Sequence, residues 1–222
     1  MVRTFLSLPL GARAGTPGPS AHPAATAPAT LSDRLSIDFY RSQAGYTPPF
    51  IGDRGREVRV FTNVIGAYAM AMAQSVLPLR DFYWEVQVVT LANRMQVGVV
   101  WQDFNDADPN SYIGFRATDW GYDNVAYLHA VATTTVFGAT YTSGDVIGVA
   151  LSASGDIWFS KNGVWQGSGN PATRANPAAT GVTSRCPAIA MDGAPGVTAR
   201  ARLRLFAAQQ SYAPPTGFST LG

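Results

Sequence analysis

The feature that most constrains the fold is a β-hairpin signal at Asn162-Gly163. The residues before it, Asp156 to Ser160, and those after it, Val164 to Gln166, are rich in aromatic and β-branched types. Asn-Gly is a pair that readily adopts the positive φ angles of a two-residue hairpin turn. We therefore expect two antiparallel strands here, with their register fixed by the turn itself.

The chain repeats this pattern of short strands and turns from residue 35 onward. Tyr83 to Val88 alternates strongly, and Val146 to Leu151 is an almost continuous apolar run. Strands separated by Gly, Asn and Asp turns are typical of a sandwich or barrel, so we expect an all-β fold, an antiparallel β-sandwich. Further strands are expected at 35–39, 58–62, 95–101, 111–115, 125–130, 188–191 and 197–206. For the segment 67–79, a strand and a short helical turn both stay open.

The first 34 residues have a different composition. Ala, Gly, Pro, Ser and Thr dominate residues 11–30, a composition that cannot build a core. Such a segment is disordered or extended alone, and a neighbouring subunit would be needed to order it. We therefore divide the chain into an extended arm at 1–34 and a sandwich domain at 35–222. The apolar run at 5–10 is broken by Pro9, which favours an uncleaved arm over a signal peptide.

The charge content argues against several classes of partner. Charged residues make up only 14% of the chain, and the net charge is +2. Arg200, Arg202 and Arg204 alternate and so share one strand face, but there is no broad basic patch of the kind that nucleic acid requires. No apolar run is long enough for a membrane span. Cys186, the only cysteine, is expected in the core.

Residues for catalysis are scarce. His22 lies in the arm, and His129 ends an apolar strand, where a hydrogen-bonded structural histidine is expected. There is no Gly-x-Ser-x-Gly motif, no phosphate-binding loop and no set of four zinc ligands. We therefore expect a protein that is not an enzyme. A carboxylate pair for glycoside hydrolysis, Asp103 with Asp119 or Asp123, is the remaining catalytic alternative.

We expect no cofactor, with calcium as a weak alternative. Asp103, Asp106 and Asp108 lie close together and offer the oxygen ligands that calcium prefers. The segment has neither the central glycine nor the closing glutamate of an EF-hand loop. A surface loop in which Asp and Asn side chains bond their own backbone explains the segment equally well.

Aromatic residues are the best candidates for a binding face. Trp84 and Trp158 lie in the middle of expected strands and should be buried. Trp120 and Tyr122 follow no strand pattern, and aromatic side chains on loops are common anchors of binding surfaces. The aromatic residues that we place at strand ends or in loops are Trp101, Phe104, Tyr112, Trp120, Tyr122 and Trp165.

The order of these motifs resembles the SPRY (B30.2) domain family, over roughly residues 60 to 210. Its most specific parts are the run Gly144-Asp145-Val146-Ile147-Gly148-Val149 and the hairpin Lys161-Asn162-Gly163. The other matching segments are Tyr83 to Val86, Val97 to Val99, Tyr112 to Phe115, Trp120 to Asp123 and Cys186 to Ala190.

The resemblance implies a bent sandwich, similar to a concanavalin-like jelly roll, that recognises proteins or peptides through loops at one end, without catalysis. Carried over to this chain, it places Tyr127 and the turn Asp192-Gly193 near the ligand face, with Trp120 beside them. The chain differs from eukaryotic members in lacking an attached signalling or ligase-recruiting segment, and in its long loop at 167–185. These differences leave the partners open.

Residues 212–221 are similar to the tails of SPRY-like proteins from bacteria and their phages. Our first hypothesis is therefore a structural protein of a phage virion or tail, which contacts neighbouring subunits through the arm and uses the sandwich for protein–protein recognition. A glycan or protein of the host surface is a further candidate partner. A carbohydrate-binding sandwich is the alternative, and a polysaccharide-active enzyme is a third. The expected location is the virion, with the bacterial cytoplasm or cell surface as alternatives.

Overall fold

The computed structural model describes residues 35–36, 50–52, 56–61, 68–73, 77–101 and 112–221. Within these residues the chain consists of β-strands and the short 3₁₀ helix η3 (Ala207–Gln209), which confirms the all-β fold. The strands are β1 (Leu35–Ser36), β2 (Phe50–Gly52), β3 (Glu57–Phe61), β4 (Tyr68–Ala73), β5 (Phe82–Thr90), β6 (Arg94–Val100), β7 (Trp120–Asp123), β8 (Tyr127–Ala130), β9 (Thr133–Val136), β10 (Val146–Leu151), β11 (Ile157–Lys161), β12 (Val164–Trp165), β13 (Cys186–Asp192) and β14 (Thr198–Arg204).

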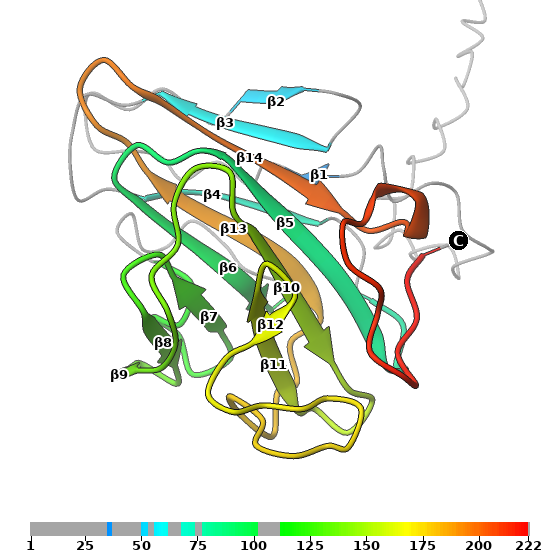
Figure 1. Cartoon of the computed structure of the whole chain (residues 1–222). Coiled ribbons are helices and arrows are strands. Elements are labelled where there is room, and N and C mark those ends of the chain that lie inside the picture. Colours follow the sequence, from blue (N-terminus) through cyan, green and yellow to red (C-terminus); the bar gives the residue numbers. More distant parts are fainter. Residues whose placement is uncertain are drawn as a thin grey trace, which may run out of the picture.

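The strands form two sheets that pack face to face as a sandwich (Figure 1). The first sheet has the order β1-β4-β13-β6-β7-β8-β9, and the second has the order β12-β11-β10-β5-β14-β3-β2. All strand pairs among the described residues are antiparallel. The antiparallel β-sandwich that the sequence predicts is therefore confirmed.

The core lies between the two sheets and follows the alternation of the strands. Val97 and Ile189 of the first sheet face Trp84 and Val149 of the second, and all four are almost completely buried. Residues at alternate positions point to the opposite faces of the sheets. The polar residues at 94, 96 and 123 thereby come to the outer face of the first sheet.

Two hairpins close with two-residue turns. The predicted turn at Asn162-Gly163 joins β11 to β12, with Lys161 paired to Val164 and φ angles of 50° and 79°. A second turn, Val131-Ala132, joins β8 to β9 with φ angles of 51° and 57°. Both turns have the two positive φ angles that define a type I′ turn, but only the first has residues suited to it.

Three expectations about strands need correction or completion. The open segment at 67–79 forms the strand β4 rather than a helical turn. Residues 112–118 form turns and bends instead of the end of a strand, because Gly114 takes a φ of 94° and the Ile113 N–H donates to a side chain, Gln96 Oε1. The sequence pattern does not predict the strands β2, β7 and β9.

The arginines of β14 share one face of the second sheet, as predicted, but they are not simply solvated. Arg200 and Arg202 each pair with Glu57 at 2.9 Å, and Arg204 lies 3.4 Å from Glu85. Burial alone would raise the pKa of Glu57, but hydrogen bonds from arginines, including Arg59, outweigh it and lower this pKa to about 2. The carboxylate therefore stays ionised and holds β3 against β14.

The segment after β14 covers part of the same outer face. Phe218 packs edge-on against Trp158 at 6.0 Å, and Tyr83 and Ala150 complete this cluster. Backbone bridges join Phe82 to Ser219 and Phe206 to Leu221. Residues 205–221 therefore form part of the folded unit (Figure 1). Cys186 is buried, which confirms its expected place.

The expected arm at 1–34 lies outside the described residues. In the part of the chain that the structure describes, no helix has the length and apolar character needed to cross a membrane. The long loop at 167–185 is confirmed: it contains isolated bridges and turns between β12 and β13.

Candidate functional site

The outer face of the first sheet carries a cavity of about 560 Å³, which we call the outer-face cavity. Its walls come from β4, β6, β7, β8, β9 and β13 and from the segments next to them. The lining residues are Tyr68, Asn93, Arg94, Gln96, Tyr112, Asp123, Tyr127, His129, Thr134 and Asp192. Its mixture of tyrosine rings with charged and amide groups is typical of a recognition site.

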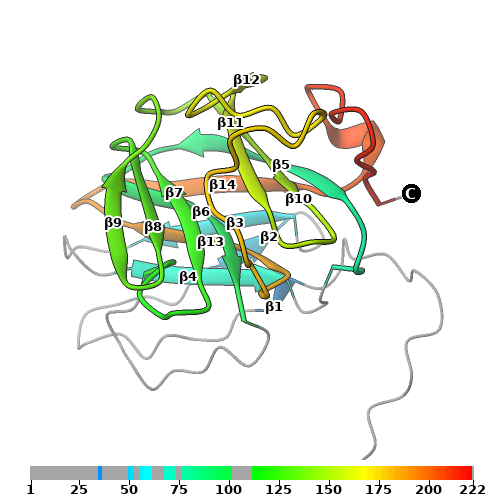
Figure 2. The same cartoon turned by 90° about the horizontal axis from the view of Figure 1, so that it is seen from below.

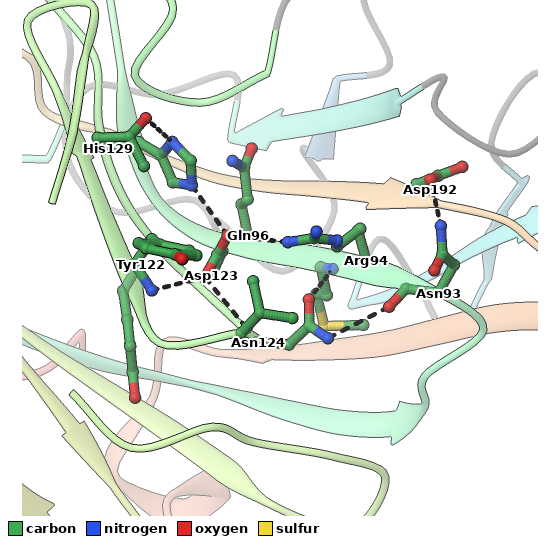
Figure 3. Close-up of polar contacts among 12 residues, drawn as sticks. Asn93, Arg94, Gln96, Tyr122, Asp123, Asn124, His129 and Asp192 are labelled. Carbon is green, nitrogen blue, oxygen red and sulfur yellow. Dashed lines mark hydrogen bonds and ion pairs between the residues drawn. The ribbon is translucent and has the colours of Figure 1, made fainter. Parts of the chain in front are cut away.

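Asp123 lies at the centre of the polar network in this cavity (Figure 3). Its Oδ2 atom lies 2.9 Å from His129 Nε2 and 3.5 Å from Arg94 Nη1. Its Oδ1 atom accepts hydrogen bonds from the backbone N–H groups of Val125 and Tyr127. These two bonds close the turn between β7 and β8, so one carboxylate fixes both the turn and the histidine.

His129 is hydrogen-bonded through both ring nitrogens. Its Nδ1 atom lies 3.1 Å from Thr134 Oγ1 on β9, opposite the contact with Asp123. The ring also packs edge-on against Tyr112 at 5.2 Å. The sequence prediction of a hydrogen-bonded strand histidine is thus confirmed, and the ring ties β7, β8 and β9 together.

Gln96 on β6 is almost completely buried and has a fixed orientation. Its Oε1 atom accepts the Ile113 N–H at 2.9 Å, so turning the amide over would bring two donors together. Its Nε2 group finds no acceptor among the described residues. A buried donor without an acceptor costs about 1–3 kcal/mol, and the Nε2 atom itself has almost no exposed surface.

The lining of the cavity contains two carboxylates. Asp192, the last residue of β13, is buried and accepts a hydrogen bond from Asn93 Nδ2 at 2.7 Å. Asp123 is the second carboxylate, and Arg94, partly exposed, is the cation between the two (Figure 3). A ligand that brings another negative charge would meet two buried carboxylates here.

The tyrosine rings supply contact area and hydroxyl groups. The rings of Tyr68 and Tyr112 lie 6.1 Å apart, and Tyr127 is 37% exposed at the margin. Burial raises the pKa of Tyr68 to about 12, and the nearby Arg94 charge opposes this rise. Tyr68 therefore remains a neutral phenol that can donate or accept a hydrogen bond.

The line Thr134–His129–Asp123 has the residue types of a nucleophile, a base and an acid. However, the hydroxyl faces Nδ1 and the carboxylate faces Nε2, which is the reverse of a catalytic triad, and Thr134 is an exposed residue of an edge strand. In the described ranges, no group of three or more His, Cys, Asp or Glu residues is arranged to hold a metal ion. The arrangement offers fixed hydrogen-bonding groups, which suit recognition.

The placement of Trp120 and Tyr122 in loops was wrong. Both lie in β7 and point into the core, with exposures of 4% and 0%. The Tyr122 ring packs against Phe137, Tyr141 and Phe159, and its hydroxyl donates to Ala139 O. Every residue of this strand is buried, so it lacks the alternation that the sequence interpretation relied on.

The residues that the family resemblance places near the ligand face do not all lie at the cavity. Tyr127 and Asp192 come together at the outer-face cavity, whereas Gly193 follows Asp192 and is buried outside its lining.

The other candidate residues lie elsewhere. Trp101 is 39% exposed directly after β6, and Trp165 packs edge-on against Tyr83. Phe104 and the calcium candidates Asp103, Asp106 and Asp108 lie outside the described residues.

The two partners considered for a glycosidase pair differ in their surroundings. Asp119 precedes β7 and is completely buried, and burial raises its pKa to about 6 against the opposing influence of Arg116. Asp123 lines the outer-face cavity. Since Asp103 lies outside the described residues, the proposed pair itself has no described geometry.

The sequence reasoning missed five lining residues: Tyr68, Asn93, Arg94, Gln96 and Thr134. Arg94 and Gln96 alternate with Met95 and Val97, which is a signal that they share the outer face of a strand. That signal alone could have identified them as candidates. Thr134 carried no comparable signal, because it becomes part of the cavity only through the pairing of β9 with β8.

The fold defines a class, the antiparallel β-sandwiches. Within that class, the profile of the SPRY domain matches residues 81–191, half of the chain, and the chain belongs to the SPRY domain family. A crystal structure of a human SPRY domain aligns with a TM-score of 0.54 at 21% identity, covering 72% of this chain and 97% of that chain. No curated protein matches the sequence.

Proposed function

We propose that this chain is a non-catalytic binding module that holds a segment of a partner protein in the outer-face cavity. SPRY domains typically serve in protein–protein interaction and are generally not catalysts. The cavity is built from six strands of one sheet, so its shape is present before a partner arrives. Such a preformed site loses little conformational entropy on binding.

The observation that carries this proposal is the Gln96 amide. Its Nε2 group is buried in the lining of the cavity, and the Ile113 N–H fixes its direction. Because the Nε2 atom has almost no exposed surface, a ligand oxygen satisfies it only when the neighbouring side chains move slightly apart on binding. The two carboxylates, Asp123 and Asp192, disfavour an anionic group at this place, so a neutral carbonyl oxygen of a peptide fits best.

The test is the substitution Gln96→Glu. The carboxylate keeps an acceptor for the Ile113 N–H but removes the donor, and we expect at least a tenfold loss of affinity, about 1.4 kcal/mol. The probe is a peptide selected from a library of random dodecapeptides on the immobilised protein, and the affinity is measured by calorimetry. Thermal unfolding verifies that the variant is folded.

The matched control is Gln87→Glu, the same chemical change on the second sheet, where the side chain accepts a bond from Arg204. It should leave peptide affinity unchanged. Equal affinities of the Gln96→Glu variant and the original protein would rule out the cavity as the binding site.

A carbohydrate ligand is the second candidate. Trp120 and Tyr122 no longer support it, because both are buried. The cavity itself does, since tyrosine rings next to carboxylate and amide groups can stack on a sugar and bond its hydroxyls. A glycan array with the same protein distinguishes the two ligands: glycan binding lost on Tyr127→Ala would favour the sugar.

We also propose that the module works within a larger assembly, a phage virion or tail, with residues 1–34 as the contact to neighbouring subunits. The low charge content and the Pro/Ala-rich composition of that segment support this proposal. Deletion of residues 1–30 should prevent incorporation into particles and leave a folded domain. Normal incorporation of the truncated chain would refute the assembly role.

A further inference from the structure

The strand β9 forms one edge of the first sheet, and no described residue pairs with its outer side. Figure 2 shows it at the margin of the molecule, beside β8. All four of its residues are exposed, and Val136 is 80% exposed. An edge of this kind presents backbone N–H and C=O groups that another chain can pair with.

The sequence of β9 offers none of the usual protection for an edge. It reads Thr-Thr-Thr-Val, without a charge or a proline, and its pairing with β8 is regular. Proteins commonly blunt such edges with lysine, proline or a bulge. Four β-branched residues instead favour continued strand pairing.

The register shows which backbone groups face outward. The Phe137 N–H donates to Ala126 O at 2.8 Å, which continues the ladder of β9 with β8. In an antiparallel ladder, alternate residues direct both backbone groups toward the partner strand. Residues 133 and 135 therefore bond to β8, while Thr134 and Val136 direct their N–H and C=O groups outward.

The hairpin that presents this edge is held in an unfavourable conformation. Val131 and Ala132 both have positive φ angles, which is unusual for a β-branched residue. The surrounding contacts hold it there: the Ala132 N–H donates to Gly114 O at 3.0 Å, and Thr134 bonds to His129. The edge is thus fixed in place before any partner binds.

We propose that the partner segment binds as an added β-strand on the outer edge of β9. The inference rests on the proposed function and specifies how the partner is held. Thr134 belongs to both the edge and the cavity lining, so one extended segment can pair with β9 and continue into the outer-face cavity.

The chemistry of the edge selects the partner. Val136 lies opposite Tyr127 on the cavity face, and both are exposed, so they form an apolar strip without charge. An extended, uncharged segment with apolar side chains at alternate positions matches this strip. A second copy of the chain fits less well, because two four-residue strands alone bury far less than the roughly 1,200 Å² of a stable interface.

The first test separates the backbone of β9 from its side chains. Val136→Pro removes an outward N–H without removing a bond to β8, and should weaken the binding of the selected peptide at least tenfold. Val136→Ala keeps that N–H and is the matched control, with less than a threefold loss. Equal affinities of the two variants would overturn the proposal, and thermal unfolding verifies that both are folded.

The second test measures amide hydrogen exchange by NMR. On addition of the peptide, the Thr134 and Val136 amides should slow at least tenfold, while the Thr135 amide, already bonded to β8, should change little. Unchanged exchange at Thr134 and Val136, together with peptide binding that Gln96→Glu abolishes, would refute the added strand but keep the cavity as the site. Sedimentation of the protein alone gives a third outcome: self-association abolished by Val136→Pro would assign the edge to a second copy and overturn the proposal.

Discussion

The two hairpins β8–β9 and β11–β12 have the same turn geometry, but only β11–β12 has turn residues that favour it. At β11–β12 the turn is Asn162-Gly163, and the Asn162 side chain bonds both Asp145 and the Val146 N–H. At β8–β9 the turn is Val131-Ala132, which gains no such side-chain bonds. The first hairpin forms because its own residues favour it, and the second because its surroundings impose it.

The β11–β12 hairpin belongs to the scaffold of the sandwich, whereas the β8–β9 hairpin belongs to the surroundings of the candidate site. The β11–β12 hairpin contributes Phe159 to the core, and its turn residues favour its register locally, with Asp145 and Val146 adding support. The β8–β9 hairpin depends on Gly114, Asp123 and His129, and it borders the outer-face cavity. Backbone strain that surroundings maintain is found preferentially at functional sites, and here it occurs at the hairpin that borders the candidate site.

The largest loss of stability should come from filling the space between Gly114 and His129, next to the β8–β9 hairpin. Gly114 has a φ of 94°, and a Cβ there would lie 2.4 Å from His129 Cβ and 2.7 Å from its backbone. Gly114→Ala should lower the free energy of unfolding by about 3 kcal/mol, since strain and overpacking add. Urea denaturation measures the change.

Gly144→Ala is the matched control, because Gly144 has the same φ of 94° with nothing within 4 Å of the added Cβ. It should cost only the backbone strain, about 1 kcal/mol. Equal losses in the two variants would show that the contact between Gly114 and His129 does not support the hairpin.

A smaller loss is expected at the β11–β12 turn. In Gly163→Ala the new Cβ would lie 2.6 Å from Tyr212 Cδ1, at a φ of 79°. The ring can move away more easily than the backbone at His129 can, so we expect a loss of about 2 kcal/mol. Calorimetric unfolding tests this value, and a loss larger than that of Gly114→Ala would reverse the order of the two hairpins.

Placing the turn residues of β11–β12 into the strained β8–β9 turn should stabilise the protein. The double substitution Val131→Asn with Ala132→Gly should raise the free energy of unfolding by about 1–2 kcal/mol, because Asn and Gly tolerate positive φ. Urea denaturation detects the gain. The reverse exchange, Asn162→Val with Gly163→Ala, is the control and should destabilise the protein; a gain in both would contradict the comparison.

The smallest effect is expected at the contact between β9 and the histidine. Thr134→Val removes the hydroxyl that bonds His129 Nδ1 but keeps the shape of the side chain, at a cost of about 0.5–1 kcal/mol. Thr135→Val, next to it on β9, is the control and should change stability by a few tenths of a kcal/mol at most. Thermal unfolding of both variants would reveal whether the hydroxyl matters.

The comparison also explains what the sequence could predict. Asn162-Gly163 and the alternation around Trp84 are local signals, and the structure confirms both the turn and the buried strand. The Thr-Thr-Thr-Val strand has suitable residues, but no turn signal at Val131-Ala132 separates it from β8. The strand was therefore missed.

The candidate site is harder to predict from the sequence than the fold is. Three of its residues, Tyr68, Arg94 and Asp192, meet only because β13 pairs with both β4 and β6. These strands are far apart in the chain. Tyr127 and Asp192 were found through family resemblance, and the roles proposed for them stay predictions. The alternation around Gln96 indicates its place on the outer face, but the fixed direction of its amide depends on the Ile113 N–H, a contact that no local pattern reveals.

The central position of β14 has a consequence for how this protein is made. β14 lies between β3 and β5 in the second sheet, although it comes more than 100 residues after β5 in the chain. Until the ribosome has released residue 204, β3 and β5 lack the strand that joins them. The nascent chain must then keep its apolar strands from aggregating before the sandwich can close, which makes early contact with a chaperone advantageous.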